Sequence, residues 1–459
     1  MTSSAPAVVI GAGISGLVCA YALNKAGIDT LVLEASPRAG GVIRSERRDG
    51  FLLELGPQSF SGTASLRALC KELGIADEFL QAPADAPRYV LIDGKLKEVP
   101  LNPVAMLASS LLSPTTKWKI ARDAFATTSA PESDESVAAF VRRKFGAQLL
   151  DRLAAPFVSG IYAGDPERLS LRSAFPQLHD AEKSAGSVIR GMMRAAKSRK
   201  GPRERPTLLS FREGNERLVR ALAGKLGSRL RLGAEVLGIA VPREAAAPSF
   251  ELRLRQAGKE ETLAANRLVM ATPADVAGVL LRDANAAFEP VLGGMEYAPV
   301  AVVSLGYLRE HVGHSLQGFG FLAPRSSGLR MLGCVWNSSL FPEREAAGHV
   351  LLTSFVGGAT DPTAASLSPE ELRELVHREL APVLQIRGSP VFSHTQLYRH
   401  ALPQYNIGHS ERLIALQRLR AELPGLFFVG NYLRGPAIGN CVDLAMQVAG
   451  DITKLSKST

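Results

Sequence analysis

The sequence predicts an α/β fold whose parallel sheet is built from both ends of the chain. Residues 7–10 form a short β-branched run, residues 14–25 have helical character, and residues 30–33 form a second apolar run. A strand, a helix and a second strand in this order predict a right-handed crossover and a parallel sheet. Near the other end of the chain, the apolar run 426–429 precedes a helix that we expect from about Val442.

The remainder of the chain divides into two further parts. Residues 100–206 lack alternating strand patterns and have the character of helices broken by loops. Pro369–Leu384 has the apolar spacing of an amphipathic helix. The strands expected in the second half are 229–241, 250–255, 267–271, 300–308 and 350–356. The three expected domains are a nucleotide-binding domain (1–82, 207–272 and 400–459), a mixed-sheet substrate domain (83–99 and 273–399) and an inserted helical domain (100–206).

The amino-acid composition indicates a globular protein and limits the kinds of partner that it can bind. The chain has 459 residues, of which 46% are apolar and 21% charged, the usual balance of a globular protein with buried cores. The formal net charge of +9 favours an anionic partner, either a polycarboxylate substrate or an anionic membrane surface. Aromatic residues make up only 6%, and no nucleic-acid-binding motif is present, so we exclude nucleic acid.

Four dispersed cysteines predict neither a disulfide framework nor a metal site, because none forms a C-x-x-C pair or has a histidine at ligand spacing. This usage suits a reducing cytosol. The first residues lack the basic region of a secretory signal. No apolar stretch reaches 18 residues, so we expect no transmembrane helix.

A glycine-rich turn follows the first strand and opens the first helix. A Rossmann-like dinucleotide site needs a tight turn, close approach of backbone to a pyrophosphate, and close packing of helix on strand, and glycine meets each need. Glu34 ends the second strand, where a carboxylate accepts ribose hydroxyl groups and disfavours the 2′-phosphate of NADP. The turn is Gly11-Ala12-Gly13-Ile14-Ser15-Gly16.

An extension of this motif points to a flavin. The sequence from Glu34 continues as Ala35-Ser36-Pro37-Arg38-Ala39-Gly40-Gly41, and this E-x-x-x-R-x-G-G pattern resembles the flavin amine oxidase and desaturase superfamily. The resemblance implies FAD as cofactor. It also implies that the Gly-Gly turn lets backbone approach the flavin side of FAD, and that Arg38 lies near the phosphates.

Motifs in the segments 56–60, 160–166, 318–320, 402–409 and 439–441 make the chain similar to the protoporphyrinogen oxidase family, and this resemblance extends from Val8 to about Ala449. Gln58 stands where many relatives have Asn, and the closing segment has Gly439 where relatives often have the first residue of Asn-Asp-Cys. The motifs are Gly56-Pro57-Gln58-Ser59-Phe60, Gly160-Ile161-Tyr162-Ala163-Gly164-Asp165-Pro166, Gly318-Phe319-Gly320, Leu402-Pro403-Gln404-Tyr405 with Gly408-His409, and Gly439-Asn440-Cys441.

This resemblance implies an enzyme that removes six electrons from a porphyrinogen through FAD, with dioxygen as acceptor and hydrogen peroxide as product. No side chain is expected to act as general acid or base, and no metal is expected. The implied substrate-binding residues are Arg88, whose guanidinium suits a propionate, with Gly160, Leu322 and Phe355. The implied cofactor-binding residues are Gly11, Ala12, Gly13, Ile14, Ser15, Gly16, Glu34, Ala35, Arg38, Gly40, Gly41, Gly56, Pro57, Gln58, Ser59, Val236, Gly430, Ala437 and Ile438.

Several alternatives stay open at this point. The substrate within the family is either protoporphyrinogen IX or coproporphyrinogen III, with two or four carboxylates. An amine oxidase or desaturase is a second enzyme class, and a flavin-free binding protein, like the GDP-dissociation inhibitors, is a different class. The apolar run 101–112 and the basic run 190–205 suit a peripheral anchor on the inner face of the cytoplasmic membrane. A homodimer is expected from the resemblance alone.

Overall fold

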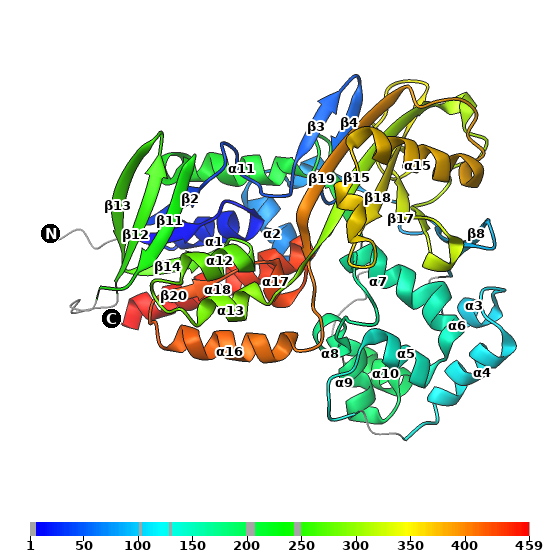
Figure 1. Ribbon diagram of the computed structural model, residues 1–459, viewed down its shortest axis with the longest axis horizontal. Coiled ribbons are helices and arrows are strands. Elements are labelled where there is room, and N and C mark those ends of the chain that lie inside the picture. The colour runs from blue at the N-terminus through cyan, green and yellow to red at the C-terminus, as the bar shows by residue number, and fades with distance from the viewer. Residues whose placement is uncertain (1–5, 101–102, 128–130, 199–206, 243–248, 459) are drawn as a thin grey trace.

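A computed structural model shows that the chain folds into three lobes (Figure 1). The structure describes residues 6–100, 103–127, 131–198, 207–242 and 249–458. The first lobe contains both chain ends and a parallel sheet. The second contains a larger mixed sheet, and the third is helical. The mixed α/β class predicted from the sequence is confirmed.

The parallel sheet has the strand order β10-β2-β1-β14-β20. Val8 in the central strand pairs with Leu31 on one side and Leu268 on the other. The predicted strand 229–241 is wrong as one element, because Gly233 has a φ of +65° and divides it into two. The strands are β1 (Ala7–Ile10), β2 (Thr30–Glu34), β10 (Leu230–Leu232), β14 (Arg267–Met270) and β20 (Leu426–Phe428).

Helices cover one face of this sheet. α1 (Ile14–Lys25) packs against α18 (Ile438–Ser458) and α11 (Glu216–Leu226), and their apolar side chains share one core with α2 (Ala64–Glu72). The helix expected from about Val442 therefore begins four residues earlier, at Ile438. Its first turn lies next to the first turn of α1, because the Ser15 side chain hydrogen-bonds to the Cys441 thiol.

The other face carries an antiparallel meander and three helices. They are β11 (Ala234–Ala240), β12 (Phe250–Gln256), β13 (Lys259–Ala265), α12 (Ala274–Leu280), α13 (Phe288–Gly293) and α16 (His409–Ala421). Phe288 and Leu292 of α13 share a core with Val8 and Ile10 of β1. Residues 274–295, which the sequence analysis assigned to the substrate domain, therefore pack with the parallel sheet.

The second lobe is a mixed sheet with the order β19-β15-β18-β17-β16-β7-β8. One face is covered by α15 (Pro369–Leu384), the predicted amphipathic helix, whose Leu372, Val376 and Leu380 enter the core. The strands are β7 (Arg88–Ile92), β8 (Lys95–Glu98), β15 (Tyr297–Leu308), β16 (Gly320–Leu322), β17 (Met331–Trp336), β18 (His349–Gly357) and β19 (Phe392–Pro403).

The third lobe contains the helices predicted between residues 100 and 206. A buried cluster of charges joins them, with Lys144 bonded to Glu182 at 2.7 Å and to Asp123 at 3.3 Å. Leu111 and Leu112 are buried against β7, so the end of the predicted apolar anchor belongs to a core. The helices are α3 (Pro103–Ala108), α4 (Pro114–Asp123), α5 (Val137–Lys144), α6 (Ala147–Leu149), α7 (Ala155–Tyr162), α8 (Leu171–Ala174), α9 (Pro176–Ala185) and α10 (Val188–Ser198).

A buried ion pair joins the first two lobes. Glu54 ends β4 (Phe51–Glu54), and Arg344 follows α14 (Asn337–Leu340). Their side chains are 2% and 1% exposed and lie 3.4 Å apart. Arg344 also donates to the carbonyl of Phe211, in β9 (Leu208–Phe211).

Further hydrogen bonds complete the surroundings of Glu54. Its carboxylate accepts the Ser45 hydroxyl at 2.6 Å and the Asn215 N–H at 2.9 Å, from β3 (Ser45–Arg48) and from the residue before α11. Burial raises the pKa of Glu54 to about 7, and the opposing influence of Arg344 and these hydrogen bonds favours the ionised form. The pair is therefore stable only while both partners are present.

Replacing Arg344 with methionine leaves the Glu54 carboxylate buried and unpaired. We expect a loss of about 3 to 5 kcal/mol in the free energy of unfolding at pH 8, measured by urea denaturation. A buried carboxyl with a raised folded pKa loses stability as pH rises above its unfolded pKa, so the loss should be smaller at pH 6.

The matched control is Arg212→Met, which removes an ion pair to Glu343 whose side chains are 62% and 58% exposed. It should cost no more than about 1 kcal/mol at either pH. Glu54→Gln combined with Arg344→Met should recover part of the single-variant loss. An Arg344→Met protein as stable as the control would contradict a joining role for the pair.

Candidate active site

The glycine-rich turn brings β1, α1 and β14 into close contact. A Cβ at Gly16 would lie 2.0 Å from the Gly11 carbonyl oxygen, so only glycine allows α1 to pack this closely on the turn. Gly11 has a φ of +103°, and a Cβ there would lie 2.8 Å from the Ala271 carbonyl oxygen. Both glycines therefore serve backbone packing, as the motif predicts.

Two other glycines border an open space. A Cβ at Gly13 would meet no atom within 4 Å, and one at Gly41 would meet only the Gly13 Cα, at 3.5 Å. Gly13 is also the residue before α1, and no side chain caps that end of the helix. The N–H groups of the first turn and the positive end of the helix dipole therefore face this space, which suits an anion.

Glu34 lies beside the turn and is held by two backbone N–H groups. Its Oε2 accepts from Ala12 at 2.7 Å, and its Oε1 accepts from Ser36 at 2.9 Å. A carboxylate oxygen has capacity for more than one hydrogen bond, so both can still accept a hydroxyl group. Val236 of β11 packs in the core beneath this strand end, together with Leu33.

Arg38, which the resemblance places near the phosphates, is held by its own turn. Its guanidinium donates to the carbonyls of Ala39, Gly41 and Ile43, and it also faces Glu216 at 3.7 Å. These contacts tie the side chain to the turn that contains Gly40 and Gly41. In this structure Arg38 shapes the turn, and its donors are directed at carbonyl groups.

The segment 54–58 is also fixed by its side chains. A Cβ at Gly56 would lie 2.0 Å from the Val42 carbonyl oxygen, so this glycine allows two loops to touch. Gln58 donates to the Glu54 and Gly56 carbonyls at 2.8 and 2.9 Å, and its Oε1 accepts from Asn337 at 2.7 Å. The hydrogen bonds of the Gln58 side chain therefore link the first lobe to the second. Pro57 accepts from Asn215, and Ser59 follows in the same segment.

The closing segment approaches from the C-terminal side. Gly430 precedes the short helix α17 (Asn431–Arg434), and Gly435 follows it with a φ of +134°. Ala437 lies immediately before Ile438, where α18 begins. Because the first turns of α18 and α1 are in contact through Ser15 and Cys441, two helix N-termini meet at this end of the parallel sheet.

The register of the mixed sheet places the expected substrate residues on one face. Leu322 pairs with Gly333, and Gly333 pairs with Phe355. Paired residues share a face, and so do residues two apart on a strand. Arg88 pairs with Gly320, two residues before Leu322, and therefore lies on this face too. The face is opposite to the one that α15 covers.

Arg88 is exposed at the start of β7, and its guanidinium lies 5.6 Å from the centroid of the Phe319 ring. No carboxylate is paired with it in the part of the chain that the structure describes. Gly160 of α7 contacts the same face, because a Cβ there would lie 2.7 Å from Leu322 Cδ2. The helical lobe and the mixed sheet therefore meet at Leu322.

Two residues of β19 complete this face and were missed by the sequence analysis. Val302 pairs with both Phe355 and Gln396, and Val300 pairs with Tyr398, so Gln396 and Tyr398 share the face of Phe355, with β15 between them and Phe355. Burial raises the pKa of Tyr398, and the charges of Arg38 and Arg44 oppose this rise. No local pattern in residues 392–403 indicated which side chains lie on this face.

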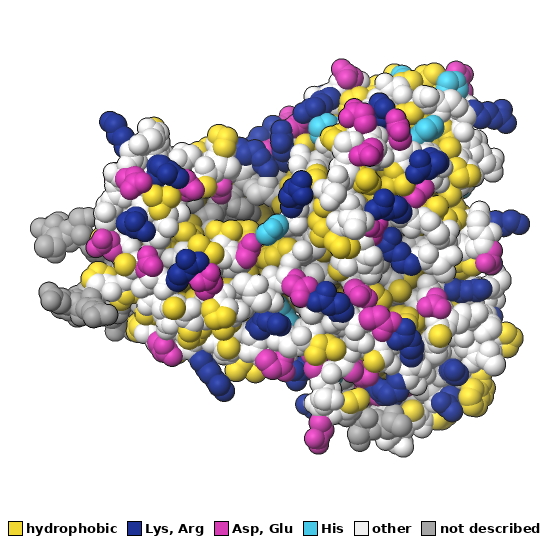
Figure 2. Space-filling view, viewed as in Figure 1, with side chains coloured by type: hydrophobic (Ala, Val, Ile, Leu, Met, Phe, Trp, Pro, Cys, Tyr) yellow, Lys and Arg dark blue, Asp and Glu magenta, His cyan; other side chains and the backbone are white. Residues whose placement is uncertain are grey.

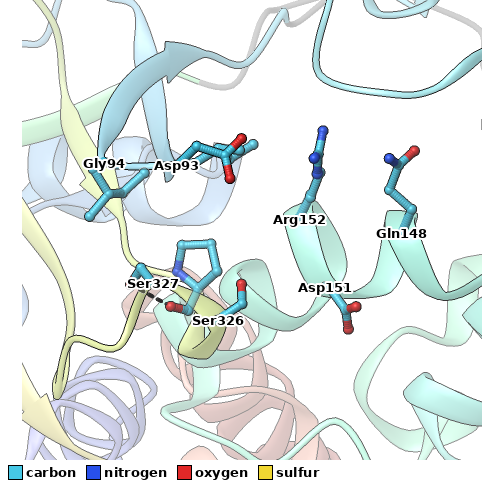
Figure 3. Close-up of a pocket in the computed structure, with 10 residues that line it drawn as sticks. Asp93, Gly94, Gln148, Asp151, Arg152, Ser326 and Ser327 are labelled. Carbon is cyan, nitrogen blue, oxygen red and sulfur yellow. Dashed lines mark hydrogen bonds between the residues drawn. The ribbon is translucent and has the colours of Figure 1, made fainter.

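A separate pocket of about 530 Å³ lies beyond the far end of β7, between the β7–β8 turn and the helical lobe. Figure 3 shows Arg152 and Gln148 projecting from one helical segment toward the level of Asp93, with Ser326 below them. None of the residues predicted for the site is among those that line it. The lining is polar and carries both charges, unlike the apolar row at Leu322 and Phe355.

Comparisons with known proteins agree with this arrangement. Residues 14–453 match the family described as flavin containing amine oxidoreductase. The chain is 35% identical to the chloroplastic protoporphyrinogen oxidase of Nicotiana tabacum, over 97% of this chain and 85% of that protein. It is 29% identical to the coproporphyrinogen III oxidase of Bacillus subtilis, over 97% of each chain.

Among solved structures, a protein from Exiguobacterium sp. 255-15, provisionally assigned as a protoporphyrinogen oxidase, superposes with a TM-score of 0.81. It is 25% identical, and the match covers 99% of both chains. The glycine-rich turn, Glu34, the Gly-Gly turn and the closing segment thus occur in one fold that is shared over nearly the full chain. This protein belongs to the flavin containing amine oxidoreductase family.

Proposed function

We propose that this protein oxidises protoporphyrinogen IX to protoporphyrin IX, with FAD as its flavin and dioxygen as electron acceptor. The observation that carries the proposal is the alignment of Arg88, Leu322 and Phe355 on one face of the mixed sheet. An apolar row with one guanidinium at its margin suits a large apolar ring that bears propionate groups. One porphyrinogen yields six electrons and six protons, and three dioxygen molecules become three hydrogen peroxide molecules.

The residues present fit the FAD cofactor. The open space at Gly13 and Gly41 admits a pyrophosphate against the first turn of α1, and Glu34 is held where it accepts ribose hydroxyl groups. Ala12, Ser15, Gly40 and the closing residues Ala437 and Ile438 border the same end of the sheet. When bound, the flavin supplies the two-electron acceptor that no side chain provides.

The protein itself binds and orients the substrate. Arg88 pairs with a propionate, Leu322 and Phe355 pack on the ring, and Gly160 allows α7 to approach Leu322 closely. Tyr398 has a raised pKa and stays protonated at neutral pH, so it can donate a hydrogen bond but does not serve as a base. Of the six hydrogens that the substrate loses, three would leave as hydride to the flavin and three as protons to solvent, and the reduction of three dioxygen molecules to hydrogen peroxide takes up six electrons and six protons.

The test is anaerobic mixing of the purified yellow protein with protoporphyrinogen IX and, in parallel, with coproporphyrinogen III. We expect bleaching of the flavin absorbance and appearance of porphyrin fluorescence with protoporphyrinogen IX, and recovery of the absorbance in air. A response to coproporphyrinogen III alone would assign this chain the activity named for its Bacillus subtilis relative. A response to neither would favour an amine oxidase or a desaturase, and a colourless protein would favour a flavin-free binding protein.

In the same assay, Arg88→Ala should raise KM by about 10- to 100-fold, because a charged hydrogen bond to a carboxylate is worth about 1.5 to 3 kcal/mol. The matched control is Lys95→Ala, which removes a cation from the other end of the same hairpin. Equal KM values for the two variants would remove Arg88 from the substrate site.

Gly41→Ala tests the cofactor cradle. The added Cβ meets only the Gly13 Cα at 3.5 Å within the protein, yet it projects into the space assigned to FAD. We expect at least about tenfold weaker FAD binding to the apoprotein, from overlap together with the cost of a left-handed alanine. Gly27→Ala is the control, since Gly27 has a φ of +82° and open space around it at the end of α1. If both variants bind FAD equally, the space at Gly13 and Gly41 is not the FAD-binding site.

We propose further that the helical lobe contacts the inner face of the cytoplasmic membrane from the cytosol. Trp118 and Phe125 are 60% and 82% exposed, and the Arg122 guanidinium lies 4.9 Å from the Trp118 ring centroid. An exposed aromatic pair beside a cation suits the interface of an anionic bilayer. Within the described residues no helix is long and apolar enough to span a membrane, so such a contact would be peripheral.

Two findings concern the basic run 190–205, which is expected to contact anionic lipid. Arg190 donates to the Ala126 and Ala185 carbonyls, so its guanidinium is used within the lobe. Residues 199–205 of the run lie outside the described residues. Figure 2 shows acidic and basic side chains interspersed over the visible face, so the positive net charge is not gathered on that face.

The double variant Trp118→Ser/Phe125→Ser should co-sediment several-fold less than the parent with vesicles of phosphatidylcholine and phosphatidylglycerol. Loss of apolar area at the interface is the expected cause. The control is Val276→Ser/Val279→Ser, which removes two exposed apolar side chains from α12 on the first lobe. Equal sedimentation of the two double variants would contradict the proposed surface.

A further inference from the structure

Two sequence motifs that carry no evident chemistry meet in the structure. They are the segment 159–166 at the end of α7 and the segment 402–409 after β19. Leu169 forms a β-bridge with Asn406, and the Ser170 N–H donates to the Tyr405 carbonyl at 2.8 Å. The contact joins the helical lobe to the first lobe, at the point where the chain leaves the mixed sheet.

Gln404 fixes the C-terminal end of α7. Its Nε2 donates to the Tyr162 carbonyl at 2.9 Å and to the Leu402 carbonyl at 3.0 Å, and its side chain is buried. The next residue in the helical segment, Ala163, is in the left-handed conformation, with a φ of +46°. Its carbonyl accepts the Ala359 N–H at 2.7 Å. The end of α7 is therefore bound on two sides.

This end matters because α7 also touches the substrate face. Gly160, three residues before Ala163, lies against Leu322. A shift of the helix end would move Gly160 relative to Leu322, since three residues of a helix are less than one turn. Gln404 thus acts on the substrate face through the position of α7.

Tyr405 fixes the closing segment on the opposite side. Its hydroxyl donates to the Asn431 carbonyl, at the start of α17, and lies near the Gly435 N–H, at its end. Burial raises the pKa of Tyr405 well above its ordinary value, so the hydroxyl keeps its proton for this donation. The ring stacks on His409, with centroids 4.4 Å apart and an angle of 7° between the planes.

The hydroxyl of Tyr405 spans a four-residue helix that is too short to be stable alone. Gly435 has a φ of +134°, which few residues adopt, so the turn after α17 depends on contacts to hold it. Ala437 and the first turn of α18 follow directly. The position of the residues expected beside the flavin therefore depends on Tyr405.

We propose that Gln404 and Tyr405 form a positioning element that aligns the substrate face with the flavin-binding segment. Adjacent in the chain directly after β19, they bind the end of α7 on one side and residues 431–435 on the other, so two consecutive residues link the two segments. The proposal rests on the proposed function for its substrate side. Its cofactor side depends only on flavin binding.

The test compares Tyr405→Phe and Gln404→Met with Tyr307→Phe as the matched control. Tyr307 is also fully buried with a hydrogen-bonded hydroxyl, to His377 at 3.0 Å, but it lies on the α15 face of the mixed sheet. Three quantities are measured for each: the thermal midpoint of unfolding, the Kd for FAD of the apoprotein, and KM and kcat for protoporphyrinogen IX.

Tyr405→Phe should weaken FAD binding by about tenfold, the effect of one or two lost hydrogen bonds, and should change the visible circular dichroism of the bound flavin. Gln404→Met should raise KM several-fold and leave the Kd for FAD unchanged. Gln404→Asn, which keeps the amide but withdraws it from Tyr162, should reproduce that KM change even if the methionine variant does not fold. Tyr307→Phe should lower the thermal midpoint without either change.

The positioning role is overturned if Tyr405→Phe and both Gln404 variants lower only the thermal midpoint, as Tyr307→Phe does. It is also overturned if every variant changes both the Kd for FAD and KM, because that pattern indicates a general loss of structural order and not two separate positioning roles. If the parent protein oxidises no porphyrinogen, the proposed function fails, while the FAD measurement on Tyr405→Phe still decides the cofactor side.

Discussion

The arrangement of the site depends on the buried ion pair between Glu54 and Arg344. Removing two charges from water costs several kcal/mol for each ion, and only close pairing with additional hydrogen bonds offsets that cost. Ser45 and Asn215 supply these bonds to Glu54, and the backbone at Phe211 accepts one from Arg344. Because the partners come from separate lobes, the pair is satisfied in one relative placement of them. Segment 54–58 starts at Glu54, so the ion pair also fixes the position of this segment, which is expected beside the flavin, relative to the two lobes.

Local backbone chemistry made the first lobe predictable. Gly11 needs a positive φ and Gly16 needs the absence of a Cβ, and both requirements are visible in the sequence because only glycine meets them. Strand 7–10 and helix 14–25 have the predicted limits for the same reason, since the apolar run of the strand stops at Gly11 and the helix ends just before Gly27. By contrast, the predicted strand 229–241 ran through Gly233, where a positive φ ends β10.

The side-chain roles at the site were less predictable, because they depend on partners far away in sequence. The motif around Arg38 indicated phosphate, and no local pattern showed that its side chain also bonds to the carbonyls of its own turn. Gln58 could be interpreted only once Asn337 was seen opposite it, 279 residues later. Tyr398 was missed because strand register decides which side chains of β19 share the face of Phe355, and no local pattern specifies pairing with Val300.

The site therefore lies where the three lobes meet, and this location limits which of its residues can be replaced. The row from Leu322 to Phe355 belongs to the mixed sheet, Gly160 to the helical lobe, and Gly13 and Gly41 to the parallel sheet. Side chains on the proposed substrate face of the mixed sheet can change without altering the glycine-rich turn. Changes in α7 are more constrained, because its end is bonded to Gln404 and Ala359. The segments whose motifs showed no chemistry of their own are those where the lobes are joined, so their sequence is restricted by the alignment of the site as a whole.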